Sequence, residues 1–305
     1  MKKKMFELLL KNKEDLSLKN LNETLITDAE ISKAIKELGQ INTENFLNPK
    51  TEKYLKTKYI GNEILMFKEV DSTNTVAEFL AENGTDEGTI IISEIQTHGK
   101  GRHGRKWESP KGGVWLSIIL KPDIIPSKAP FITLATGVAV AKTLQNFGAE
   151  ARIKWPNDIL INDKKVSGIL TEASTISNKI DYVIVGVGID NNFSISQFPE
   201  ELQKISTTLE NELKTEVKDT ELISKFLNEF EKIYDLFKEE KIDEILNDWR
   251  KMSATIGNHV EIKQGPKSIK GYVVGINDEG ALVLEENNGN LREITSGECI
   301  IKKEN

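Results

Sequence analysis

The sequence holds one cysteine, Cys299, among its 305 residues, so no disulfide can form within the chain and an ordinary zinc cluster is excluded. Long apolar runs are also missing: near the basic N-terminus only residues 5–10 are apolar, and Glu7 interrupts them. This run is too short for a signal peptide or a membrane span, so we expect a cytoplasmic protein with no membrane partner. There is no excess of basic residues, since the formal net charge is −7, which disfavours broad affinity for nucleic acids.

What is present suits a globular protein of more than one domain, with 38% hydrophobic and 29% charged residues. Apolar residues at helical spacing predict a small helical unit over residues 1–45. We expect an α+β domain over 46–252. Short strands broken by glycine-containing turns predict a small β-barrel over 253–305. The barrel strands are expected at 259–263, 269–276, 281–284 and 291–295.

The helical unit has the pattern of a helix-turn-helix, which binds DNA by laying one helix in the major groove. Charge argues against that function, because residues 1–45 hold eight lysines and eight acidic residues. The recognition helix would be 28–38, with two lysines against three acids. We therefore favour a helical cap or an element of a homodimer, with DNA binding as the alternative.

In the central region, the polar turn 71–74 precedes a predicted helix over 75–83. A helix over 131–147 is apolar nearly all round, which predicts burial. Residues 219–250 predict two amphipathic helices, and 46–66 a linker with one short helix. Strands are expected at 64–67, 88–95, 114–120, 151–155, 159–162, 166–173 and 182–189.

The segment 99–107, GKGRHGRKW, combines three glycines with four cations and no acid. It spells G-x-G-x-x-G, but a dinucleotide fingerprint must open a helix. Pro110 and the pair 112–113, both glycine, cannot form the body of that helix. The segment is therefore interpreted as a flexible loop between two strands that binds an anion such as phosphate; a solvated surface loop is the alternative. Its cations are Lys100, Arg102, Arg105 and Lys106.

Two further polar segments suggest a binding site. Side chains alternate along a strand, so Lys154 lies opposite its apolar neighbours on 151–155, and Asp158 caps the following turn or points back to the site. The hydroxyls and amide of 72–74 suit a neutral polar head group such as a ureido ring. Each segment alone also has a structural interpretation without a binding role. Lys154 would be an exposed lysine beside an Asx turn, and 72–74 would be a helix N-cap.

In this order along the chain, these segments resemble those of a biotin protein ligase. The segments are Ser72–Asn74, Gln96 before the glycine-rich loop, Lys154–Asp158, Lys165-x-x-Gly168-Ile-Leu and Gly186-x-Gly188-Ile. The resemblance covers about residues 50–303. It implies a central mixed or antiparallel sheet with helices, as in class II synthetases, and an SH3-like barrel. Residues 1–45 resemble more loosely the helix-turn-helix of the bifunctional ligase–repressor form, but 40–49 is too short for its wing hairpin.

The resemblance implies that biotin and ATP, accompanied by Mg²⁺, form biotinoyl-5′-AMP, and that biotin then passes to a lysine of a biotin carboxyl carrier protein. Lys154 would bridge the carboxylate and the α-phosphate. Arg102, with Lys100 beside it, would clamp the phosphate and protect the intermediate from water. Asp158 would orient the incoming amine, and Arg105 is a candidate for triphosphate contact. The implied binding residues are Ser72, Thr73, Asn74, Gln96, Lys100, Gly101, Arg102, Arg105 and Lys154.

The chain departs from the family pattern at Lys100, where arginine is usual, and at Asp190, where asparagine is usual. Lysine keeps the charge but loses bidentate geometry. Asp190 would place a negative charge near the nucleotide unless Asn191 and Asn192 compensate. Trp107 fits either a pocket wall or the core. The alternative functions are a lipoate or octanoate ligase and a biotin-responsive DNA-binding repressor.

Overall fold

The computed structural model describes residues 54–302, so the helical unit expected at 1–45 lies outside the described residues. Its centre is a seven-stranded sheet in the order β1-β2-β3-β7-β6-β5-β4, in which β1 and β2 are parallel and all other neighbours antiparallel. Its elements are β1 (Ile64–Val70), α5 (Thr73–Glu82), β2 (Ile90–Gln96), β3 (Val114–Leu120), α6 (Ala129–Gln145), β4 (Arg152–Lys154), β5 (Asp158–Ile161), β6 (Lys164–Ile176), β7 (Lys179–Ile189), α7 (Glu200–Gln203), α8 (Leu209–Leu213), α9 (Asp219–Lys238) and α10 (Ile242–Met252).

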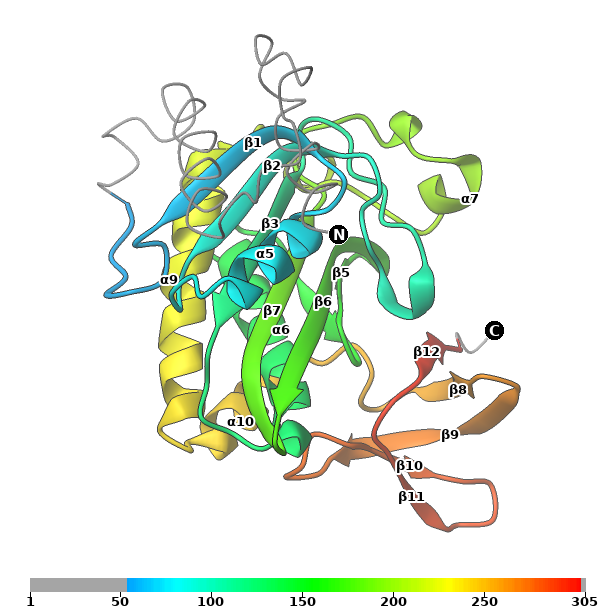
Figure 1. Cartoon of the computed structure of the whole chain (residues 1–305). Coiled ribbons are helices and arrows are strands. Elements are labelled where there is room, and N and C mark those ends of the chain that lie inside the picture. Colours follow the sequence, from blue (N-terminus) through cyan, green and yellow to red (C-terminus); the bar gives the residue numbers. More distant parts are fainter. Residues whose placement is uncertain (1–53, 303–305) are drawn as a thin grey trace, which may run out of the picture.

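Helices cover both faces of this sheet: α5 lies on one face, and α6, α9 and α10 lie on the other (Figure 1). This explains why β3 is apolar almost throughout instead of alternating, since all seven of its residues are buried. Ile118 packs on the α6 side, and its neighbour Ile119 packs on the α5 side. The α+β class with a mixed central sheet is thus as predicted.

The helix expected at 131–147 is α6, and 13 of its residues are buried, as its uniformly apolar sequence predicts. The two amphipathic helices of 219–250 are α9 and α10. One expectation needs correction. The helix expected to start at residue 75 starts at Thr73, because Ser72 takes the N-cap position and its carbonyl accepts from the Val76 N–H. Within 54–66 the structure has no helix, and the remainder of 46–66, where one short helix is expected, lies outside the described residues.

The C-terminal unit is a five-stranded antiparallel sheet in the order β11-β10-β9-β8-β12. Its strands are β8 (His259–Gln264), β9 (Lys267–Ile276), β10 (Leu282–Glu285), β11 (Leu291–Ile294) and β12 (Glu298–Ile301). The sequence predicts four of them and misses β12. This strand pairs with β8 and lies on the side of the sheet that faces the central domain (Figure 1). The division of the chain at residue 253 stays a prediction.

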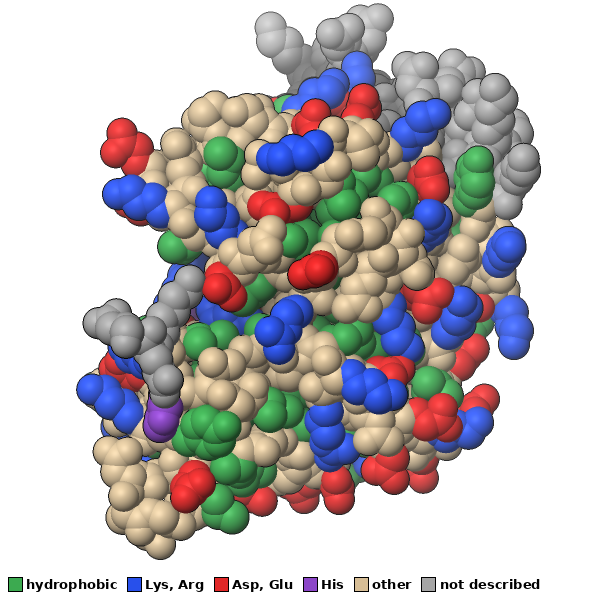
Figure 2. All heavy atoms as spheres, turned by 180° about the vertical axis from the view of Figure 1, so that it is seen from behind, with side chains coloured by type: hydrophobic (Ala, Val, Ile, Leu, Met, Phe, Trp, Pro, Cys, Tyr) green, Lys and Arg blue, Asp and Glu red, His purple; other side chains and the backbone are tan. Residues whose placement is uncertain are grey.

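No helix in the described range 54–302 is long and apolar enough to cross a membrane. On the face shown in Figure 2, basic and acidic side chains are interspersed without a field of one sign. The described residues of that face therefore form no electrostatic footprint for a polyanion.

The chain enters the central domain through a segment held by one buried carboxylate. Glu231 of α9 accepts the backbone N–H groups of Lys58, Tyr59 and Ile60 at 2.6, 3.0 and 2.9 Å. Its side chain is almost fully buried, so these bonds satisfy both the charge and three backbone donors. Glu231 therefore fixes the segment before β1 onto α9.

Replacing Glu231 by alanine leaves these three donors without an acceptor, so we expect a loss of about 2–4 kcal/mol in the free energy of unfolding. Urea denaturation measures the loss. The matched control is Glu229→Ala on the same helix, which breaks a surface pair with Lys232 and should cost at most about 0.5 kcal/mol. Equal effects of the two variants would contradict the anchoring role.

Candidate functional site

A cavity of about 470 Å³ lies between the central sheet, the loop after β2 and strand β12. All residues proposed for the site from the sequence line it. They are Ser72, Thr73, Asn74, Gln96, Lys100, Gly101, Arg102, Arg105, Lys154 and Asp158. The structure thus brings together segments that lie more than eighty residues apart, and their individual roles remain predictions.

One end of the cavity is polar and uncharged. Gln96 Oε1 accepts from the Thr73 backbone N–H at 2.8 Å and from its hydroxyl at 3.1 Å. The Ser117 hydroxyl lies 2.7 Å from Thr73 Oγ1 and 2.6 Å from Asn74 Oδ1, and the Asn74 amide donates to Glu172 at 2.8 Å. Ser72 occupies the N-cap position of α5, but its side chain makes no capping hydrogen bond. The plain N-cap interpretation therefore does not account for the Ser72 hydroxyl.

Two glycines of β7 form the floor of the cavity by letting side chains lie directly on the strand. A Cβ at Gly186 would stand 2.2 Å from Asn74 Oδ1, and a Cβ at Gly188 would stand 2.5 Å from Trp107 Nε1. Neither position admits a side chain without displacing its neighbour. These two glycines therefore serve the site itself.

Trp107 meets both interpretations: its ring lies against Gly188 and lines the cavity, and it also packs against the buried aromatic cluster around Trp115. Its ring meets Trp115 edge-on at 6.3 Å between centroids, and the Lys165 ammonium lies 4.8 Å from its ring centre. Trp107 Nε1 is buried and has no hydrogen-bond partner within residues 54–302.

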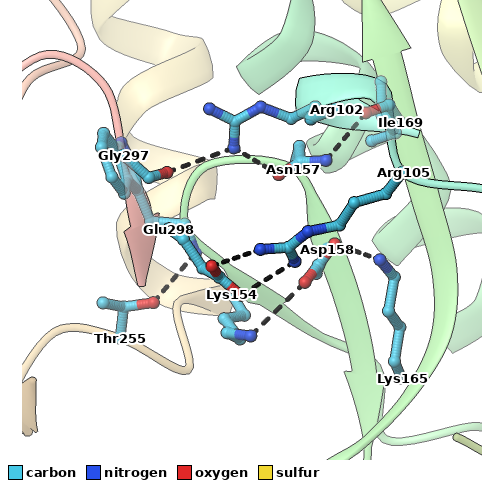
Figure 3. Close-up of polar contacts among 11 residues, drawn as sticks. Arg102, Arg105, Lys154, Asn157, Asp158, Lys165, Ile169, Thr255, Gly297 and Glu298 are labelled. Carbon is cyan, nitrogen blue, oxygen red and sulfur yellow. Dashed lines mark hydrogen bonds and ion pairs between the residues drawn. The ribbon is translucent and has the colours of Figure 1, made fainter. Parts of the chain in front are cut away.

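The other end of the cavity is cationic and is organised by Asp158 at the start of β5 (Figure 3). Lys165 Nζ lies 2.6 Å from one oxygen of Asp158, and Lys154 Nζ lies 3.4 Å from the other. Burial raises the pKa of the Asp158 carboxyl, but Lys165 and Lys154 outweigh burial, and the net pKa lies below its ordinary value. Asp158 is therefore a carboxylate that holds two ammonium groups at one place.

Lys165 is one of the site residues that the sequence did not single out. Regular alternation along β6 would place it on the face of Ser167 and Ile169, opposite to Gly168. The register shifts between Ile159 and Leu160 of β5, so that Val166 is an extra residue on β6. This bulge turns Lys165 to the same face as Gly168 and into the cavity. Its place in the Lys165-x-x-Gly168 motif was the available signal.

The glycine-rich loop contains one 3₁₀ turn, Arg102–Gly104, and no other helix follows within 105–113. This agrees with rejecting the dinucleotide fingerprint. Arg102 donates to Asn157 Oδ1 at 3.0 Å and to the Gly297 carbonyl at 3.3 Å, while Arg105 pairs with Glu298 (Figure 3). Lys100 lies about 4 Å from Glu78 and Glu172.

Asp190, at the end of β7, lines the cavity and is buried, and its Oδ1 has no hydrogen-bond partner within 54–302. Burial raises the pKa of Asp190 well above its ordinary value, although Lys165 opposes this. Asn191 and Asn192 do not compensate for it in the cavity, because their amides donate to the Val217 carbonyl at 2.9 and 2.6 Å. The negative charge expected at Asp190 is thus disfavoured by its surroundings.

Comparisons with known proteins identify the family. Residues 66–190 match the model of the biotin/lipoate A/B protein ligase family, and residues 255–302 match the biotin protein ligase C-terminal domain. The bifunctional ligase/repressor BirA of Bacillus subtilis is 37% identical over 80% of this chain and 75% of its own length. The chain belongs to the biotin protein ligase family.

Other members confirm this assignment. The biotin--[acetyl-CoA-carboxylase] ligase of Mycobacterium tuberculosis is 29% identical over 78% of this chain and 90% of its own. The biotin protein ligase of Aquifex aeolicus, solved in complex with biotin and ATP, is 31% identical with a TM-score of 0.68, covering 80% of this chain and all of that one. The five-stranded sheet is accordingly the SH3-like C-terminal domain that the sequence predicted.

Asp219, at the start of α9, holds the backbone that follows this site. The Asn191 amide donates to Asp219 at 2.6 Å. Burial raises the pKa of Asp219 to about 6, the Asn191 bond opposes this, and Glu216 and Glu94 add to it. The folded state thus favours the neutral acid, and the stability this contributes is present below pH ~4 and lost as pH rises through ~6.

Asp219→Asn keeps the acceptor and removes this titration. Relative to the unsubstituted protein, we expect it to gain up to about 3 kcal/mol of unfolding free energy at pH ~7.5, and the gain to shrink as pH falls toward ~5. Urea denaturation at several pH values measures the difference. A pH-independent difference would show that Asp219 does not titrate in this range.

Proposed function

We propose that this protein is an ATP-dependent biotin protein ligase that forms biotinoyl-5′-AMP and transfers biotin to a lysine of a biotin carboxyl carrier protein. The observation that carries the proposal is the layout of one cavity, in which an uncharged polar end adjoins an end with two paired lysines and an arginine. A ligand with a neutral polar ring and an anionic tail matches this layout.

In this proposal the ureido ring of biotin meets Ser72, Thr73 and Asn74, which offer both donors and acceptors, and Gln96 completes that end. Trp107 and the glycine floor of β7 enclose the apolar part of the ligand. The biotin carboxylate then reaches Lys165, whose ammonium lies over the Trp107 ring. Lys154 and Arg102, on the side toward β12, meet the α-phosphate and the neighbouring phosphate oxygens.

The first step joins two anions. A carboxylate oxygen attacks the α-phosphorus, the bond from that phosphorus to the bridging oxygen of the β-phosphate breaks, and pyrophosphate leaves. Lys154 and Lys165 offset the repulsion and stabilise the charge on the phosphorus. In the second step the carrier lysine nitrogen attacks the acyl carbon and AMP leaves, with Asp158 orienting the amine.

Magnesium is proposed to arrive as the ATP complex. Within residues 54–302 no group of three His, Cys, Asp or Glu side chains is placed to hold a metal ion. Phosphate oxygens of ATP, and not side chains of the protein, would therefore supply most of the ligands of the magnesium ion. We also propose that the reaction takes place in the cytoplasm, where both ATP and carrier proteins are synthesised, and that two chains associate through residues 1–45.

Pyrophosphate exchange into ATP tests the activity and separates it from that of a lipoate or octanoate ligase. We expect exchange to require biotin, and a biotin carrier domain to gain the mass of one biotinoyl group at its lysine. Exchange driven by lipoate or octanoate, with none driven by biotin, would replace the proposal by the rival enzyme.

Lys154→Ala and Lys165→Ala should each lower biotin-dependent exchange by about 10²–10³-fold, because each removes a cation at the reacting anions. Lys111→Ala is the control, since Lys111 pairs with Glu94 outside the cavity. Near-normal exchange by Lys154→Ala would remove it from the phosphate site, and the same result for Lys165→Ala would remove that residue.

Arg102→Ala should form the adenylate slowly. It should also release biotinoyl-AMP at least about tenfold faster than the unsubstituted protein does. Filtration of the enzyme after a single turnover, followed by measurement of free biotinoyl-AMP, gives the release rate. Retention equal to that of Lys111→Ala would contradict the clamp.

Repression is the second candidate, favoured by the names of the Bacillus subtilis and Escherichia coli relatives, both bifunctional ligase/repressor BirA. The residues that would bind DNA, 1–45, lie outside the described residues. A gel shift with a biotin-operon promoter, with and without biotin and ATP, tests this function. A ligand-dependent, salt-sensitive complex would support it.

A further inference from the structure

The glycine-rich loop is tied to the C-terminal sheet at the turn that precedes β12 (Figure 3). Arg102 reaches the Gly297 carbonyl at 3.3 Å, and Arg105 Nη1 donates to Glu298 Oε1 at 2.9 Å while its Nη2 meets the other oxygen. These partners are 193–195 residues apart in sequence. The contact therefore joins two domains across the mouth of the cavity.

The two arginines differ in the charge of the groups that hold them. Both protein contacts of Arg102 use Nη1, which leaves Nε and Nη2 for a ligand. Arg105 has both terminal nitrogens on the Glu298 carboxylate in a bidentate pair. Each arginine keeps further N–H donors, but Glu298 already neutralises the charge of Arg105, whereas the acceptors that hold Arg102 are uncharged. Arg102 therefore attracts an anion more strongly than Arg105 does while both are held.

Fixing Arg105 fixes the loop backbone. The Gly101 N–H donates to the Arg105 carbonyl at 2.7 Å, and the Trp107 N–H donates to the Gly99 carbonyl at 2.8 Å. The Arg105 bond lowers the pKa of the Glu298 carboxyl more than burial raises it, so the pair is ionic. Arg102 and Trp107 lie on the stretch that this pair holds.

We propose that Glu298 is a positioning residue: by pairing with Arg105 it holds the loop 99–107 closed over the cavity, and Arg105 serves this contact rather than the triphosphate. The C-terminal sheet then contributes to the site by restraining the loop that carries Arg102. What the loop shields rests on the proposed function, whereas the restraint itself is a property of the protein without ligand.

Hydrogen exchange of the loop amides in the full chain without ligand tests the restraint. Glu298→Ala should speed exchange over 99–107 about two- to fivefold, the range of an exposed ion pair. The charge swap Arg105→Glu with Glu298→Arg should restore exchange toward the original rate. Unchanged exchange in Glu298→Ala, or a swap that exchanges like Glu298→Ala, would overturn the proposal.

The matched control is Glu261→Gln, which removes an acid of the same sheet that pairs with Lys302 at 2.7 Å. It should leave exchange in the loop unchanged. Salt provides a second readout if the swap does not fold. Raising NaCl from about 0.05 to about 0.5 M should speed loop exchange in the unsubstituted protein but not in Glu298→Ala. An equal salt response in both would overturn the restraint.

Release of biotinoyl-AMP links the restraint to function. Glu298→Ala should release the intermediate several-fold faster, and the swap should recover retention with little change in KM for ATP. A swap variant whose KM for ATP rises at least about tenfold without recovered retention would assign Arg105 to the triphosphate and overturn the proposal. If the unsubstituted protein makes no biotinoyl-AMP, the proposed function fails. Hydrogen exchange of the loop amides then tests by itself whether Glu298 restrains the loop.

Discussion

The cationic end of the cavity depends on the ion pairs that the Asp158 carboxylate makes with two lysines. Two lysines and an arginine crowd one end of a partly buried space, and like charges at such distances repel strongly in a medium of low dielectric. Asp158 lies 2.6 and 3.4 Å from the two ammonium groups. Burial lowers the pKa of Arg102, and Asp158 opposes this lowering. Asp158 therefore keeps the cationic end assembled before any anion arrives.

This arrangement fits a reaction that unites two anions. Asp158 neutralises part of the positive charge of the lysines and the arginine. The ligand carboxylate and triphosphate bring more negative charge than Asp158 supplies, so they neutralise these cations further. The raised pKa of Asp190 fits the same account, because a second carboxylate in this space would weaken the attraction. The uncharged end, built on Thr73, Asn74 and Gln96, adds selectivity without adding charge.

Much of this was predictable from sequence, and the exceptions have physical reasons. Uniformly apolar runs identified β3 and α6, and the proposed site residues all line one cavity. Lys165 was missed because a bulge reverses the face that alternation predicts. Glu298 was missed because its partner Arg105 is 193 residues away, a proximity that only the packing of the two domains creates.

The central claim is that this cavity makes and retains a biotinoyl adenylate. The most direct measurement is to incubate the full chain with biotin, ATP and Mg²⁺, separate it from free ligands, and identify the bound molecule by mass. We predict about one biotinoyl-AMP per active site, discharged when a carrier domain is added. An enzyme that emerges without the adenylate and leaves the carrier unmodified would contradict the account.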